Sequence, residues 1–140
     1  MNTIPEIEQQ IIEEFSKFDE WLDRYNYLIE LGRECPAINE NEKTEANLIK
    51  GCQSRVWLST EFIDGKVIFK ADSDAVITKG IASLLIRVLS KQTPCDILSA
   101  DLTFLDTIGL RTHLSPTRSN GLTSMIKQMK LYAMAYKMKQ

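Results

Sequence analysis

Residues 56–71 read Val-Trp-Leu-Ser-Thr-Glu-Phe-Ile-Asp-Gly-Lys-Val-Ile-Phe-Lys-Ala, and this stretch decides the fold class. Apolar side chains alternate with polar ones on both sides of Asp64-Gly65, a dipeptide typical of two-residue hairpin turns. The pattern predicts an antiparallel β-hairpin with one face turned toward a core. That face is expected to carry the alternate residues Val56, Leu58, Thr60, Phe62, Val67, Phe69 and Ala71.

Helical periodicity precedes the hairpin. From Ile4 to Ile29 apolar residues recur at three- and four-residue steps, and a break near residues 16–19 divides the run into two predicted helices. Gly32 is a predicted helix stop, and Pro36 shows that the helix has ended. The polar residues 37–47 are expected to form a loop that leads toward the hairpin.

Further helices are predicted after the hairpin. One carries the apolar residues 77–89, with Asp72, Ser73 or Asp74 as its cap and Gly80 as a point of close packing. A second starts at Thr93-Pro94, a third, short helical piece lies within residues 102–110 and ends near Gly109, and a long last helix follows Ser115-Pro116. The chain is therefore expected to be a single α+β domain over residues 1–140, with a small antiparallel sheet packed against helices.

Composition excludes several classes of protein. The 140 residues hold 17 Lys and Arg against 19 Asp and Glu, a net charge of −2, which argues against nucleic acid as the main partner. No apolar stretch approaches the length of a membrane span, so no membrane association is expected. The first residues lack the basic and apolar regions of a signal peptide, which predicts a cytoplasmic protein with reduced thiols.

Cys52 is the main candidate for chemistry. Gly51 precedes it and the hairpin follows it, which predicts a thiol on a loop that the sheet fixes at one end. Nearby Lys50 and Arg55 could favour the reactive thiolate form. The alternative is that Cys52 only packs, as many free cysteines do.

A second group of candidates lies at residues 113–122. His113 is the only histidine, and a structural role is at least as expected for it as a catalytic one. Ser115 and Pro116 fit a helix start. Arg118 is unfavourable at a helix N-terminus and is therefore expected to have an anionic partner, either an acid such as Asp72 or Asp74 or the Cys52 thiolate. Phosphate-loop, dinucleotide and zinc-ligand spacings are absent, so no cofactor or metal is expected.

These segments resemble the SufE family of sulfur-acceptor proteins, the partners of cysteine desulfurases in iron–sulfur cluster assembly. The resemblance is carried most specifically by residues 49–57, Ile-Lys-Gly-Cys-Gln-Ser-Arg-Val-Trp, and by residues 113–122, His-Leu-Ser-Pro-Thr-Arg-Ser-Asn-Gly-Leu. It extends to residues 27–32, 72–75, 79–80, 93–94 and 96–97.

The resemblance implies a fold similar to the IscU-type scaffold, with Cys52 as the persulfide acceptor. Cys52 would take sulfur from a SufS-like, pyridoxal-phosphate-dependent desulfurase, stimulate it, and pass the sulfur to a SufB-like scaffold. The chain itself would be no enzyme, would hold no cofactor, and could be a monomer or a homodimer. The matching positions expected to support Cys52 are Gly51, Gln53, Ser54, Asp74, His113 and Arg118.

Two other functions remain open from the sequence. An iron–sulfur or zinc scaffold would use Cys35, Cys52 and Cys95 together, which requires the three to converge in space. A thiol hydrolase would use Cys52 as nucleophile and His113 as base.

Overall fold

The hairpin forms as its sequence predicts. In the computed structural model, which describes residues 2–139, β1 (Val56–Ile63) pairs antiparallel with β2 (Lys66–Ser73), in register from Val56 opposite Ser73 to Ile63 opposite Lys66. Asp64 and Gly65 both have positive φ, 52° and 78°, as a tight hairpin turn requires. The turn chemistry thus sets the register of the two strands.

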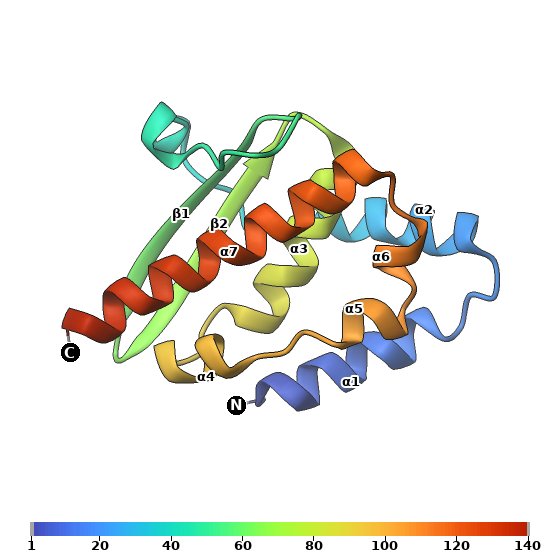
Figure 1. The fold of residues 1–140 in the computed structure, drawn as a ribbon, viewed down its shortest axis with the longest axis horizontal. Coiled ribbons are helices and arrows are strands. Elements are labelled where there is room, and N and C mark those ends of the chain that lie inside the picture. Colours follow the sequence, from blue (N-terminus) through green and yellow to red (C-terminus); the bar gives the residue numbers. More distant parts are fainter. Residues whose placement is uncertain (1, 140) are drawn as a thin grey trace.

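Two helices cover one face of this sheet (Figure 1), α3 (Val76–Leu89) and α7 (Pro116–Lys139). Val67, Phe69 and Ala71 are buried on that face, whereas Glu61 and Ile63 on the other are exposed. A residual void of about 10 Å³ marks the point where sheet, α3 and α7 meet, lined by Ile49, Val56, Leu58, Ala71, Ala82, Ile86, Met125 and Met129. The α+β fold class, with a small antiparallel sheet packed against helices, is confirmed.

The N-terminal helices pack behind α3. Thr3 caps α1 (Ile4–Phe15) in a capping box with Glu6, and α2 (Trp21–Gly32) follows the predicted break. Gly80 allows α2 and α3 to touch backbone to backbone, because a Cβ built on it would lie 2.3 Å from the carbonyl oxygen of Leu28. The prediction of close packing at Gly80 is confirmed.

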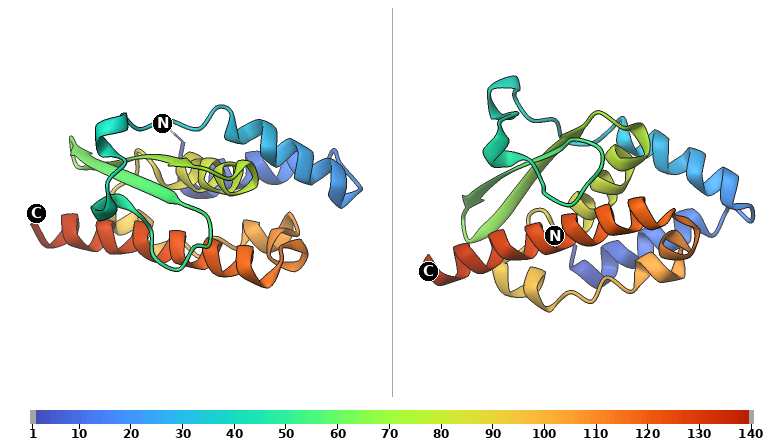
Figure 2. Two further views of the ribbon diagram at one scale, coloured as in Figure 1. Left: turned by 90° about the horizontal axis from the view of Figure 1, so that it is seen from above. Right: turned by 45° about the horizontal axis from the view of Figure 1, so that its top comes forward.

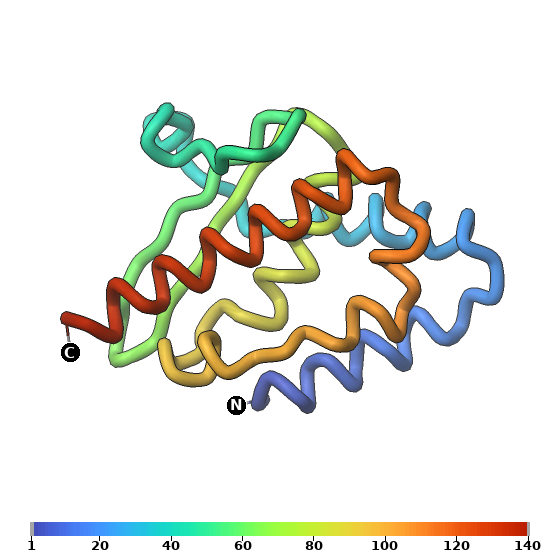
Figure 3. The backbone as a smooth tube through the Cα atoms, viewed as in Figure 1, coloured from blue at the N-terminus to red at the C-terminus, as the bar shows by residue number. Residues whose placement is uncertain are grey.

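The connection from α3 to α7 is more broken than predicted (Figure 3). Thr93 caps α4 (Pro94–Ser99) as expected, through a 3.2 Å bond from the Asp96 amide. The short helical piece predicted over residues 102–110, ending near Gly109, is confirmed as α5 (Phe104–Thr107), but a separate α6 (Leu110–His113) follows it that the pattern does not predict. Gly109 divides the two with a left-handed φ of 81°.

Two further expectations are corrected near the sheet. None of residues 72–74 caps α3, whose N-cap is Ala75 without a side-chain bond. Asp72 is paired with Lys43 and Lys79, the Ser73 hydroxyl accepts from the Ala75 amide, and the Asp74 carboxylate accepts from the Arg55 amide. The polar segment before the hairpin is not wholly irregular and contains two 3-10 turns, η1 (Glu40–Glu42) and η2 (Glu45–Asn47). Within residues 2–139, no helix combines the length and apolarity needed to cross a membrane.

Candidate functional site

The loop of residues 50–55 is closed at its base. The Ile49 amide donates to the Val56 carbonyl over 2.8 Å. Asp74 makes two further hydrogen bonds at the base of the loop. Its carboxylate accepts from the Arg55 amide at 3.0 Å, and its own amide donates to the Arg55 carbonyl at 3.2 Å. The expected anchor at the strand is present at Val56, and Asp74 adds a further anchor at Arg55.

Gly51 lets this loop lie directly against α7 (Figure 2). Its φ is +92°, a conformation that residues with a Cβ rarely adopt. A Cβ built there would lie 2.5 Å from the hydroxyl oxygen of Ser124. Glycine is therefore needed both for the turn and for the contact with the helix.

The Cys52 side chain is half-buried against the first turns of α7. Its Sγ donates a weak hydrogen bond to the Gly121 carbonyl at 3.7 Å. A Cβ built on Gly121 would lie 3.6 Å from that sulfur, which is ordinary van der Waals contact. In this tucked conformation the thiol is folded against α7, and its hydrogen-bond partner is the Gly121 carbonyl.

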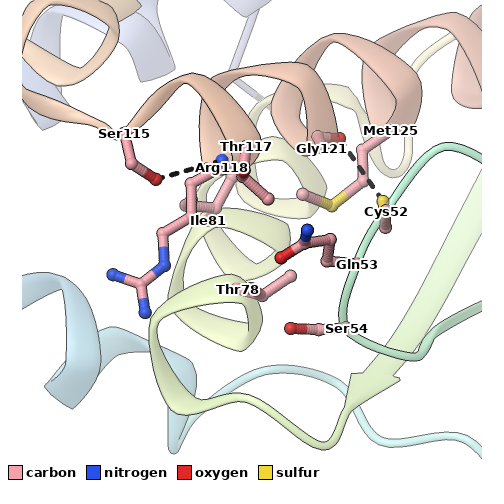
Figure 4. Close-up of a pocket in the computed structure, with 10 residues that line it drawn as sticks. All are labelled: Cys52, Gln53, Ser54, Thr78, Ile81, Ser115, Thr117, Arg118, Gly121 and Met125. Carbon is pink, nitrogen blue, oxygen red and sulfur yellow. Dashed lines mark hydrogen bonds between the residues drawn. The ribbon is translucent and has the colours of Figure 1, made fainter.

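A pocket of about 310 Å³ opens beside the sulfur (Figure 4). The loop, α3 and α7 line it with Cys52, Gln53, Ser54, Thr78, Ile81, Ser115, Thr117, Arg118, Gly121 and Met125. A second cavity of about 550 Å³ is lined by residues 45, 46 and 48–55, so Cys52, Gln53 and Ser54 border both. The tip of the loop therefore has free volume on two sides, which leaves room for it to move.

Arg118 lines the pocket but has a different partner from those predicted. Its guanidinium donates to the Tyr25 hydroxyl at 2.9 Å and points away from Cys52 (Figure 4). Asp72 and Asp74 are engaged elsewhere, as described above. The expected acidic or thiolate partner is wrong for this conformation, and Tyr25 was not predicted. The predicted cap is confirmed, because Ser115 Oγ accepts from the Arg118 amide at 3.3 Å.

His113 lies outside the lining of the Cys52 pocket. Its ring stacks on Trp21 with centroids 4.5 Å apart, and its Nδ1 is 2.8 Å from the Gly109 carbonyl. These contacts give it a structural role, joining α2 to the segment before α7. They leave the hydrolase alternative without its base beside the sulfur.

The other two cysteines lie in different surroundings. Cys35 is buried, with its Sγ 3.8 Å from the Ala71 carbonyl, and burial raises its thiol pKa to about 11. Cys95 is exposed in α4. Among residues 2–139, no group of three or more His, Cys, Asp or Glu is placed to hold a metal ion. The convergence that a three-cysteine scaffold requires is not seen in this part of the chain.

Burial controls the protonation of Cys52. Desolvation raises the pKa of its thiol above the ordinary value, and it is the one cause of the shift. Lys50 and Arg55 therefore do not offset the cost of burying a thiolate in this conformation. Because the thiolate is the nucleophile, the raised pKa makes this half-buried thiol less nucleophilic than a fully exposed one at the same pH.

We expect this lower reactivity to appear in the pH dependence of alkylation. The iodoacetamide reaction of Cys52, followed by peptide mass analysis, should rise with pH through a midpoint above that of the same chain unfolded in urea. At neutral pH the folded protein should react more slowly, because a raised pKa lowers the thiolate fraction. A folded midpoint at or below the unfolded one would contradict the tucked, desolvated thiol.

Comparisons with known proteins give consistent results. The family model described as SufE, Fe-S metabolism associated domain, matches residues 9–133. An uncharacterized SufE-like protein of Rhizobium meliloti is 40% identical over 126 residues, covering 86% of this chain and 90% of that protein. An uncharacterized SufE-like protein of Synechocystis is 34% identical over 138 residues, covering 99% of this chain and 87% of that protein.

A solved structure shares the fold. The solution structure of a hypothetical protein from Thermus thermophilus matches with a TM-score of 0.75. The match covers 92% of this chain and 94% of that one, at 22% sequence identity. At this identity the likeness concerns the fold alone.

Proposed function

This chain belongs to the SufE family of Fe-S metabolism associated domains, and on that premise we propose that it carries sulfur on Cys52. In the proposed cycle Cys52 accepts the outer sulfur of a persulfide on a SufS-like cysteine desulfurase and stimulates that enzyme. The sulfur then passes to a SufB-like iron–sulfur scaffold. The observation that carries the proposal is the position of Cys52. Its thiol is half-buried on a loop that hydrogen bonds close at the base, and a cavity lies on each side of the loop tip.

The chemistry needs no redox reagent. The Cys52 thiolate attacks the outer sulfur of the desulfurase persulfide, and a new S–S bond forms on Cys52. The old S–S bond breaks, the desulfurase cysteine leaves as a thiolate, and the proton released by Cys52 balances it. The product is a persulfide on Cys52 and a free thiol on the desulfurase.

The site supports both halves of such a cycle. Between transfers the tucked conformation shields the sulfur, because the Cys52 side chain is half-buried against α7 and its Sγ lies 3.7 Å from the Gly121 carbonyl. During transfer the loop tip can leave α7 while its base stays closed by Ile49, Val56 and Asp74. The pocket beside Cys52 has room for one additional sulfur atom.

The direct test is to locate the transferred sulfur. The wild-type protein is incubated with a cysteine desulfurase and free cysteine, and intact and peptide masses are measured. We expect one added sulfur on the peptide that contains Cys52, none on the peptides of Cys35 and Cys95, and a faster desulfurase. Added sulfur absent from Cys52, together with an unchanged desulfurase rate, would overturn the proposal.

A further inference from the structure

The charges of the chain are unevenly distributed. Helix α7 carries Arg118, Lys127, Lys130, Lys137 and Lys139 and has no carboxylate. The rest of the chain holds the other 12 Lys and Arg and all 19 Asp and Glu. A net negative protein therefore presents one strongly cationic helix, and such a surface attracts partners of opposite charge.

The outer side of this helix also exposes apolar side chains. Leu131, Met134 and Met138 are 53%, 42% and 79% exposed. Their spacing of three and four residues aligns them in a single stripe, on the side opposite the buried Met129 and Ala133. Exposed apolar groups gathered in this way mark interaction surfaces more often than isolated ones do.

The helix cannot roll to bury this stripe. Tyr136 on its inner side stacks on Phe62 with centroids 4.9 Å apart, and its hydroxyl lies 2.7 Å from that of Thr60. Lys130 donates to the Ala100 carbonyl at 2.6 Å. These contacts hold the stripe in solvent on a rigid element, as a preformed binding face requires.

We propose that this α7 outer face docks an acidic amphipathic helix of a partner protein. The face is made of Lys127, Leu131, Met134, Lys137, Met138 and Lys139. The heptad-like stripe matches the seam of a second helix, and methionine adapts to varied apolar partners. No carboxylate on α7 neutralises the lysines of this face. The partner helix is therefore expected to carry glutamate or aspartate beside its apolar seam.

Other occupants fit less well. A second copy of this chain would bring another all-cationic α7 to the face, and the like charges would repel. A lipid surface would need a broad apolar face with aromatic anchors, whereas three residues form this stripe and the inner side of α7 is packed in the core. Nucleic acid would engage the lysines but leave Leu131, Met134 and Met138 uncovered.

The docking face lies apart from the sulfur site on the same helix. From Gly121, beneath Cys52, the rise along the helix axis is about 9 Å to Lys127, about 15 Å to Leu131 and about 25 Å to Met138. A partner held on the α7 outer face therefore leaves the pocket open to a second protein. This inference goes beyond the proposed sulfur transfer, because the partner need not touch Cys52.

The test uses the full chain and a fluorescent helical peptide with leucine at heptad positions and glutamate at the flanking ones. Fluorescence anisotropy should show binding that weakens with salt. The pair Lys127→Glu/Lys137→Glu should weaken binding by about tenfold or more. The matched pair Lys17→Glu/Lys91→Glu, with the same change in net charge on exposed residues outside α7, should leave it within about twofold. Met134→Ser/Met138→Ser should also weaken binding.

Several results would overturn the proposal. The first two are equal losses of peptide affinity for the two charge-reversed pairs, and equal affinity for a peptide with lysine in place of glutamate. The others are tighter binding to phosphatidylserine vesicles than to the acidic peptide, and self-association of the protein that Lys127→Glu/Lys137→Glu abolishes. Sulfur loading of Cys52 and thermal unfolding are measured on the same variants. Unchanged loading with failed peptide binding would reject the docking face while leaving the sulfur carrier intact.

Discussion

A Cys52→Ser variant is expected to accept no sulfur from a cysteine desulfurase and to give no stimulation of that enzyme. Serine has nearly the same size, and Cys52 makes one weak hydrogen bond in the tucked state, so the fold and the loop should be preserved. The loss is expected to be complete because a hydroxyl cannot replace the thiolate as nucleophile or hold a persulfide. Intact mass and the rate of alanine formation by the desulfurase measure the two effects.

Two controls separate chemistry from docking. Cys95→Ser changes an exposed thiol in α4 and should load and stimulate as the wild type does. Excess Cys52→Ser protein should inhibit stimulation by the wild type, since it keeps the surface around the pocket and competes for the desulfurase. Sulfur found on the Cys52→Ser variant would show that another residue accepts it.

The largest effect on stability is expected from Gly80→Ala. The new methyl group would lie 2.3 Å from the Leu28 carbonyl oxygen and 2.9 Å from its carbon, both backbone atoms of α2 that cannot rotate away. Relief requires α2 and α3 to separate, and overpacking of this kind costs about 3 kcal/mol of unfolding free energy. For a domain of this size, that cost lowers the melting temperature by about 10 °C.

Gly65→Ala is the matched control for this effect. Nothing lies within 4 Å of a Cβ built on Gly65, so its cost comes from the positive φ of 78° alone. That cost is about 1 kcal/mol. If thermal and urea unfolding show Gly80→Ala no less stable than Gly65→Ala, the contact between α2 and α3 is looser than the structure indicates.

Local patterns explain why the hairpin and most helices could be predicted. Strand alternation, the Asp64-Gly65 turn and the caps at Thr93 and Ser115 all depend on residues close together in the chain. The predictions that are wrong concern side chains that bind groups far away in the sequence instead of the neighbouring backbone. Asp72 looks like a helix cap in its sequence, but Lys43 and Lys79 bind its carboxylate in the fold.

The same distinction holds for the site. The resemblance of residues 49–57 to a known family implies a site at Cys52, Gln53 and Ser54, and in the structure all three line one pocket. Tyr25 was missed because 93 residues separate it from Arg118. Gly121 could have been found, since a glycine inside a predicted helix often marks close packing.

The hydrogen bonds that close the base of the loop also limit how far the Cys52 sulfur can move from the protein. Ile49 and Val56 are held together, so Cys52 is the third residue beyond a fixed point, and fully extended it can move about 10 Å from that point. The reach of the sulfur is therefore short. Under the proposed function, an enzyme that loads Cys52 must bring its own reactive sulfur close to that fixed point, so a deeply recessed donor would remain out of reach.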